Sequence, residues 1–297
     1  SSAVRILGPL DALVLQRSLQ ALVDRHESLR TSFPAENGKP SQRIANSLSL
    51  AFPILDVSQE QVLPLASRDA STPFDLAHGP LFRASILRCS TLEHVLLLSL
   101  HHIISDGWSM GVLLRELTDL YQAFSAGLPS PLPPLPIQYV DFTLWQRNFL
   151  SGDKLDSLLD FWKKQLRGAP DALRLPSDHP RPPVQSFRGA SIPVFISEQL
   201  LRKLQTLARD EGVTLFMVLL AAFQTLLSRY SQQHDIVVGS PVAARNHLLS
   251  EGLIGFFVNT LVLRTNLQGD PSVRALLHRV RDVSLAAFAH QELPFEK

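Results

Sequence analysis

Hydrophobic positions near the start of the chain recur at helical spacing, and further along they form a near-continuous run. After Asp11, a residue type that caps helices, apolar residues return every three or four positions and predict a helix that ends near His26. Residues 95–104 are almost continuously apolar, which is typical of a strand covered on both faces. From Ser109 to about Phe124 the spacing is helical again.

The rest of the chain continues this alternation of helices and strands. Alternation of this kind predicts an α/β or α+β fold. We expect strands at 81–87, 235–243 and 255–267, and helices at 155–166, from 197, at 214–230 and at 272–290.

Two proline-rich segments interrupt the pattern. The first has five prolines between Pro129 and Pro136 and predicts an ordered, extended surface segment. The second, at 176–183, is the candidate boundary between two lobes, which would span 1–177 and 178–297.

Composition narrows the possible partners and setting. Lys and Arg total 28 against 27 for Asp and Glu, so no global charge favours nucleic acid. The apolar runs are shorter than the roughly 18–20 residues that a membrane span needs. The single cysteine, Cys89, excludes an internal disulfide and indicates a reducing compartment, so we expect a cytoplasmic protein with no membrane partner.

Two chemical motifs overlap in the stretch LSLHHIISDGWSMGVLLREL, residues 98–117. One is Gly-x-Ser-x-Gly at 107–111, which fits the nucleophile elbow of a serine hydrolase between a strand and a helix. Ser105 and Asp106 separate the predicted strand from this elbow, and no Gly-rich oxyanion segment precedes it. No downstream Asp and His stand out as the rest of a triad, so the hydrolase is a remote alternative.

The other motif is the histidine pair with the Asp-Gly that follows. If His101 and His102 continue the strand, their side chains face opposite sides, so they cannot readily ligate one metal and we expect no metal site. One ring would then face a cavity while the other packs inward. Asp106 is a turn or helix-start residue, an orienter of the histidine, or the partner of a buried arginine, and we favour the ion pair. Gly107 permits a sharp bend or a close approach to a ligand.

The stretch resembles the His-His-x-x-x-Asp-Gly motif of nonribosomal peptide synthetase condensation domains. Four further segments resemble motifs of the same family, in the family's order. They are RHESLRTSF at 25–33, YVDFTLW at 139–145, IGFFVNTLVLR at 254–264 and HQELPFE at 290–296, where Glu292 replaces the family's usual aspartate.

The resemblance implies two chloramphenicol-acetyltransferase-like lobes in a V-shaped arrangement with the motif histidines in a tunnel. Upstream and downstream carrier proteins would present a donor and an acceptor thioester on phosphopantetheine arms, so that the acceptor amine attacks the donor and a peptide bond forms. An adenylation domain of the same megasynthase, a setting of antibiotic and other secondary-metabolite biosynthesis, would be a neighbour. The chain itself would bind no cofactor.

Carried over position by position, the resemblance makes His102 the catalytic residue and His101 its structural neighbour. Asp106 would form a structural salt bridge with Arg245. Weaker candidates for the arginine are Arg30 and Arg264.

Three further residues have expected roles at the site. Gly107 would shape the turn and could present its N–H to the intermediate, and Trp108 is a tunnel-lining candidate. Asn259 would line the tunnel or make a strand-end hydrogen bond, and the two alternatives stay open.

Peptide-bond formation from an amine and a thioester does not require a strong base. An α-amine with a pKa of about 7.7–8 is partly neutral near pH 7. His102 would accept the proton as the bond forms, or position the amine, while orientation of the two tethered substrates supplies much of the rate.

The sequence HHIISDGWS at 101–109 is similar to the motif of the subtype that accepts L-configured donors. The family's opening Ser-x-Ala-Gln-x-Arg-x-Trp and closing Arg-Asp-x-Ser-Arg-Asn segments are not found, so we expect an interior piece with both lobes incomplete at the chain ends. The alternatives are a related acyltransferase that forms an ester or amide with a carrier-bound or free acceptor, and a catalytically idle binding module.

Overall fold

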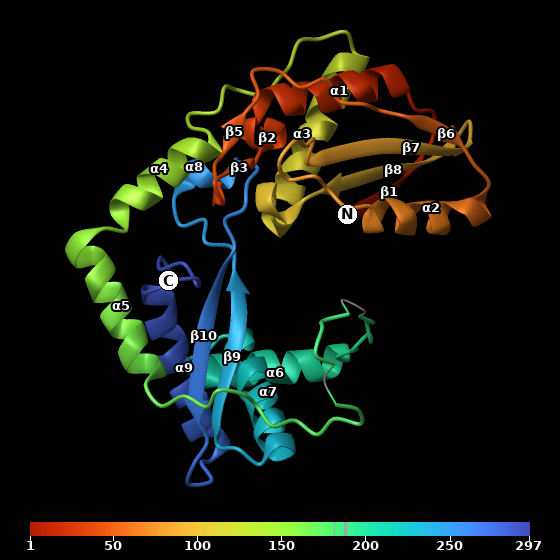
Figure 1. Cartoon of the computed structure of the whole chain (residues 1–297). Helices are drawn as coiled ribbons and strands as arrows, with labels where there is room; N and C mark the ends of the chain where they lie inside the picture. The colour runs from red at the N-terminus through yellow and green to blue at the C-terminus, as the bar shows by residue number, and fades with distance from the viewer. Residues whose placement is uncertain (181, 187–188) are drawn as a thin grey trace. The chain divides into compact units, whose positions relative to one another are not determined.

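The computed structural model describes residues 1–180, 182–186 and 189–297, and it has the mixed α/β architecture that the sequence predicts (Figure 1). Within these ranges no single helix is long and apolar enough to cross a membrane. The consecutive helices α6 (Glu198–Asp210) and α7 (Leu215–Ser231) pass the same test as a pair, with a bend of 104° between them.

Contacts group the chain into two compact units. The first comprises Ser1–Phe149 and Ala243–Val258, and the second comprises Leu150–Val242 and Asn259–Lys297. This grouping differs from the predicted lobes, 1–177 and 178–297, because a proline-rich break marks a loss of regular structure and not a change of packing partner. Arg181, inside the predicted boundary segment, lies outside the described residues.

A four-stranded sheet forms the centre of the first unit. The strand order is β1-β8-β7-β6; β8 is antiparallel to both neighbours, and β6 is parallel to β7. The strands are β1 (Ser2–Leu7), β6 (Ile54–Asp56), β7 (Phe82–Ser90) and β8 (Glu93–Leu100).

Helices cover both faces of this sheet. The helices of the first unit are α1 (Ala12–Arg25), α2 (Gln59–Ser71), α3 (Gly107–Ser125), α4 (Tyr139–Phe149) and the short α8 (Leu248–Glu251). Along β8, Leu96 and Leu98 belong to the main core with α1 and α3, whereas Val95 and Leu97 form a smaller core with α2 on the other face (Figure 1). The predicted strand with two covered faces is therefore confirmed, although it ends at Leu100.

The predicted starts of α1, α6, α7 and α9 (Val273–Ala289) are confirmed by their caps, whereas α3 and α5 (Gly152–Leu166) begin two and three residues earlier than predicted. Asp11 Oδ1 accepts hydrogen bonds from the backbone N–H groups of Leu13 and Val14 and so caps α1. The sequence did not predict β1, α2 or α4. Helix α2 contains Pro64, a residue type that usually ends or bends helices, and the face that it packs on the sheet is only partly buried. The four remaining strands are two-residue pairs: β2 (Thr31–Ser32), β3 (Ala35–Glu36), β4 (Lys39–Pro40) and β5 (Arg43–Ile44).

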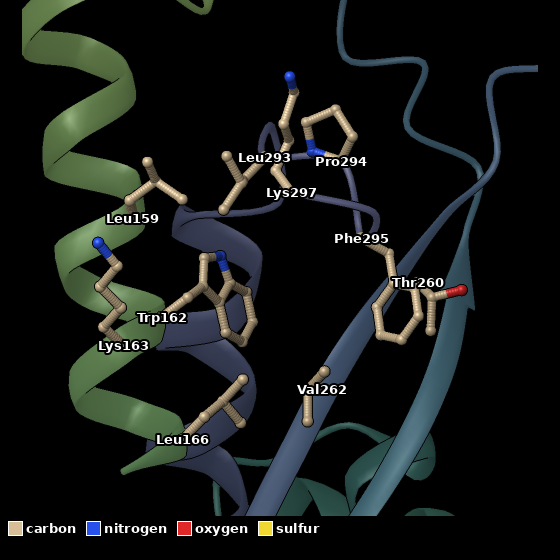
Figure 2. Close-up of a pocket in the computed structure, with 10 residues that line it drawn as sticks. All are labelled: Leu159, Trp162, Lys163, Leu166, Thr260, Val262, Leu293, Pro294, Phe295 and Lys297. Atoms are coloured by element: carbon tan, nitrogen blue, oxygen red, sulfur yellow. The ribbon is translucent and has the colours of Figure 1, made fainter.

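The second unit contains an antiparallel pair of long strands, β9 (Asp235–Val242) and β10 (Asn259–Asn266). Both were expected, but β10 starts later than the predicted 255–267, because residues 255–258 belong to the first unit. Helices α7 and α9 (Val273–Ala289) pack on these strands, and α6 packs on α7. Helix α5 (Gly152–Leu166) lies alongside α9 (Figures 1 and 2), where Trp162 Nε1 donates to the carbonyl of His290 at 3.2 Å.

Candidate functional site

The two histidines lie where β8 ends, and the chain turns before they can extend the strand. His101 Nδ1 accepts a hydrogen bond of 3.1 Å from the backbone N–H of Ile103, which caps a 3₁₀ turn over His102–Ile104. The expectation that both histidines continue the strand is therefore wrong. The cause is local, because the His101 ring accepts a hydrogen bond from the Ile103 N–H, a backbone group that would otherwise be available to a neighbouring strand.

The two rings nevertheless have different surroundings. His101 is half-buried and lies edge-on to Phe74, with ring centroids 5.9 Å apart. His102 is exposed, and its aromatic neighbour is Phe256 at 5.2 Å with the ring planes 86° apart. Within the described ranges neither ring nitrogen of His102 has a hydrogen-bond partner. The second histidine is thus the one whose nitrogens are available to a substrate.

Asp106 is the centre of a buried hydrogen-bond network. As the N-cap of α3, its Oδ1 accepts from the backbone N–H of Ser109 at 2.8 Å and lies 2.7 Å from the Ser109 hydroxyl. Its Oδ2 accepts from the backbone N–H of Phe257 at 3.1 Å. The carboxylate therefore joins the start of α3 to a segment that is distant in sequence.

Arg245 completes this network from the segment that precedes α8. Its Nη2 lies 3.1 Å from Asp106 Oδ1, and both side chains are almost fully buried. Nη1 donates to the carbonyls of Ser250 and Leu253, and the guanidinium lies 3.9 Å from the centroid of the Phe257 ring. Burial lowers the pKa of Arg245, and the adjacent Asp106 charge opposes that shift.

The weaker arginine candidates have other partners. Arg264 lies in the second unit and makes a two-point ion pair with Asp235, with Nη2 2.7 Å from Oδ2. Arg30 lies 3.5 Å from Glu27 and donates to the carbonyl of Ala45. The structure thus brings Asp106 together with Arg245 and with neither of these.

Ser109, the serine of the elbow pattern, is buried and fully engaged. Its Oγ lies within 2.7–3.1 Å of Asp106 Oδ1, Arg245 Nη2 and both backbone polar atoms of Gly255. No histidine is among these partners, so the general base of a serine triad is missing from its contacts, and the nearby Asp106 carboxylate is already paired with Arg245. The strand-to-helix elbow is also not formed, because a 3₁₀ turn intervenes.

Gly107 and Trp108 begin α3 on its exposed side. The φ angle of Gly107 is not positive, and a Cβ built there would meet no atom within 4 Å. The turn therefore does not need glycine for its bend, contrary to the sequence-based expectation. Trp108 is 47% exposed, and its indole N–H donates to the carbonyl of Glu251 at 2.9 Å.

Both polar atoms of the Asn259 side-chain amide make hydrogen bonds within the second unit. Its Nδ2 donates to the carbonyls of Gln291 and Leu293 at 2.8 and 2.7 Å, and its Oδ1 accepts from the N–H groups of Thr260 and Phe295. Of the two expectations for Asn259, the local hydrogen bond is the one that the contacts favour.

Three residues that the sequence analysis did not single out bear on the site. The Tyr139 hydroxyl donates to the carbonyl of Phe256 at 2.6 Å, and a Cβ built on Gly255 would lie less than 3.0 Å from carbons of the Tyr139 ring. Burial, reinforced by the nearby Asp106 charge, raises the pKa of Tyr139 to about 12, so the hydroxyl stays protonated. Tyr139 and Gly255–Phe256 lie in quoted motifs, but sequence spacing does not reveal their contact.

A cavity of about 280 Å³ lies elsewhere, in the second unit between α5, β10 and the last residues of the chain (Figure 2). None of the predicted site residues lines it. Its lining is largely apolar and includes Leu159, Trp162, Leu166, Val262, Leu293 and Phe295. Among the described residues no group of three or more His, Cys, Asp or Glu side chains is placed to hold a metal ion.

The sequence model of the family described as "Condensation domain" matches residues 1–297. The chain belongs to the condensation-domain family. A linear gramicidin synthase from Brevibacillus parabrevis is 50% identical over 303 residues that cover 100% of this chain. This condensation domain corresponds to only 4% of the length of that relative.

Solved structures share the fold of this condensation domain. The X-domain in its complex with OxyB from teicoplanin biosynthesis is 28% identical with a TM-score of 0.93, over 99% of this chain and 66% of that one. SgcC5 from Streptomyces globisporus, in complex with a naphthyl ethanediol and sucrose, is 32% identical with a TM-score of 0.79, over 99% and 67%. The mixed α/β fold of condensation domains, which the motif resemblance implied, is thus confirmed.

Proposed function

We propose that this condensation domain joins two carrier-bound thioesters through a peptide bond. The amine nitrogen of the acceptor attacks the carbonyl carbon of the donor thioester. A C–N bond forms, the C–S bond breaks, and the donor carrier's thiol leaves with the proton that the amine gives up. The acceptor carrier then holds a chain that is longer by the donor.

The observation that carries this proposal is the contrast inside the motif. Asp106 and Ser109 are buried with their hydrogen-bonding capacity used, whereas His102 is exposed with both ring nitrogens free of protein partners among the described residues. An imidazole next to a turn held this firmly is suited to accept the amine proton and to pass it to the departing sulfur. His102 is the proposed catalytic residue. His101 and Asp106 shape the turn, with Asp106 and Arg245 as its structural salt bridge, and Gly107 presents its N–H to the intermediate.

The proposed partners are an upstream donor carrier and a downstream acceptor carrier, with an adenylation domain in the same synthetase. Each carrier would bring its substrate on a phosphopantetheine arm, so the arm is part of the substrate and not a cofactor of this chain. The gramicidin synthase relative, of which a region like this chain is a small part, supports that setting, which we expect to be cytoplasmic.

We also propose an L-configured donor, because the sequence HHIISDGWS is similar to the motif of the subtype that accepts such donors. This is tested by loading the donor carrier with either enantiomer of one amino acid. Transfer that favours the D-enantiomer would contradict it.

Two alternatives have specific support. SgcC5 was solved with a free diol, which favours an acyltransferase that uses a free acceptor as the second candidate. The X-domain was solved in complex with OxyB, which favours a binding module without chemistry as the third.

The test is transfer between separately loaded carriers, followed by intact-protein mass spectrometry with the complete condensation domain. We compare wild type with His102→Ala, and with His78→Ala as a matched control, because His78 is an exposed histidine of the same unit. We expect the donor mass on the acceptor carrier for wild type and control, and a loss of roughly a hundredfold or more for His102→Ala.

The other outcomes separate the alternatives. Transfer to a free amine or alcohol without the acceptor carrier would support the second candidate. No transfer by wild type, together with carrier binding, would support the third. Near-normal transfer by His102→Ala would contradict the assignment of His102.

A further inference from the structure

The His102 ring needs something to orient it, because no hydrogen bond within the described residues does so. A histidine side chain with both nitrogens unpaired is free to change its rotamer, and each change moves the reacting nitrogen. Within the part of the chain that the structure describes, the ring that pairs with His102 is Phe256, edge to face at 5.2 Å. Such pairs have a preferred geometry, so Phe256 restricts where the imidazole lies.

Phe256 is itself held by its neighbours along the chain. On one side, the N–H of Gly255 donates to Ser109 Oγ at 3.1 Å, and that hydroxyl also lies 2.9 Å from the Gly255 carbonyl. On the other side, the N–H of Phe257 donates to Asp106 at 3.1 Å. The backbone of residue 256 is therefore fixed from both directions by the network at the start of α3.

Tyr139 provides the third constraint. Its ring packs where a side chain on Gly255 would otherwise be, and its hydroxyl donates to the Phe256 carbonyl at 2.6 Å. This contact explains why position 255 is a glycine although its φ is not positive. With its backbone fixed, Phe256 stays 38% exposed beside His102, which is also exposed.

We propose that Phe256 is a positioning residue for His102, and that Tyr139 acts through it by clamping the Gly255–Phe256 backbone. The inference rests on the proposed function, because it assigns Phe256 to orient the group that reacts. It leaves carrier binding unchanged, since the pair acts on the reacting ring. The predicted signature is a lower kcat with an unchanged KM for both carriers.

The experiment compares Phe256→Leu, which keeps an apolar side chain but removes the ring, with Phe256→Tyr, which keeps the ring. Both are made in the complete domain and tested with loaded carriers. We expect Phe256→Leu to lower kcat roughly three- to tenfold, the rate equivalent of one aromatic pair. Phe256→Tyr should stay near wild type. Tyr139→Phe, which removes only the hydroxyl, should lower kcat in the same direction by less.

A double-mutant cycle distinguishes positioning from general structural damage. In the His102→Ala background, Phe256→Leu should have no further effect on the residual rate, because the ring that it orients is gone. An equal loss in both backgrounds would overturn the inference, as would a wild-type kcat for Phe256→Leu while His102→Ala is inactive. Near-normal transfer by His102→Ala would instead contradict the assignment of His102 as the reacting residue, and an absence of transfer in wild type would contradict the proposed function itself.

Discussion

The exposed and buried sides of the turn after β8 lie four residues apart in sequence, yet their surroundings differ in every respect. On the buried side, Asp106 accepts hydrogen bonds from Ser109, Arg245 and the Phe257 backbone. On the exposed side, His102 has an aromatic neighbour and no hydrogen bond within the described residues. The contrast shows that the motif has two separate roles. The paired Asp106 carboxylate stabilises the turn, and the His102 imidazole, which has no hydrogen bond to the described residues, is available to the substrate.

The buried side also explains how the chain is organised. Arg245 and Phe257 lie in the segment 243–258, which leaves β9, joins the first unit, and leads into β10 of the second. A buried ion pair is stabilising only when its charges also make further hydrogen bonds, and here Arg245 Nη1 donates to two backbone carbonyls while its Nε has no partner among the described residues. The Asp of the motif is therefore expected to act on stability first and on transfer through it.

The largest effect should come from the buried carboxylate. Asp106→Ala leaves Arg245 buried without its counter-charge and should lower the free energy of unfolding by about 3–5 kcal/mol. Urea unfolding of the complete domain measures it, with Asp119→Ala, an exposed aspartate of the same helix, as the control. An unfolding midpoint equal to that of wild type would break the comparison.

Ser109→Ala should have the next largest effect. It removes a hydroxyl that Asp106, Arg245 and Gly255 share, and should cost about 1–3 kcal/mol of unfolding free energy. Because that hydroxyl is structural, transfer measured well below the unfolding temperature should persist. Complete loss of transfer by a folded Ser109→Ala protein would contradict this structural role and favour Ser109 of the Gly-x-Ser-x-Gly pattern as the reactive residue.

Asn259→Ala tests whether the second unit relies on a comparable polar anchor. The amide ties β10 to residues 291–295 at a partly buried site, so we expect a loss of about 1–2 kcal/mol. Thermal unfolding against Asn246→Ala, an exposed asparagine, measures it. A stable variant that binds carriers poorly would instead favour the tunnel-lining expectation.

The smallest effect should be at Gly107. Its φ is not positive and an added methyl meets nothing within 4 Å, so Gly107→Ala should raise the free energy of unfolding by about 0.4–1 kcal/mol through a less flexible unfolded chain. Calorimetry of the variant measures this. A destabilised Gly107→Ala would mean that the turn does require glycine.

The sequence predicted the fold class and the long helices because apolar spacing and capping residues are local signals. The caps at Asp11, Ser197, Thr214 and Ser272 are where the pattern indicated. Helix α2 was missed because Pro64 lies inside it and the face that it packs on the sheet is only partly buried. The end of β8 was misjudged because the His101 side chain, not hydropathy, stops the strand.

The candidate site was predicted only in part, because its motif is a local signal and its long-range contacts are not. His102, Asp106 and Arg245 follow from motif resemblance, and the structure brings the last two together at 3.1 Å. The roles of Tyr139, Gly255 and Phe256 depend on contacts between segments more than a hundred residues apart, such as the hydrogen bond from Tyr139 to Phe256. Spacing along one chain carries no such information.

The most direct test of the division between the two sides measures stability and transfer on the same two variants. His102→Ala should unfold at the wild-type urea midpoint while losing transfer roughly a hundredfold or more, whereas Asp106→Ala should unfold at a much lower urea concentration. If His102→Ala unfolds early, or if it transfers the donor at the wild-type rate, the exposed histidine is not the reactive side of this turn.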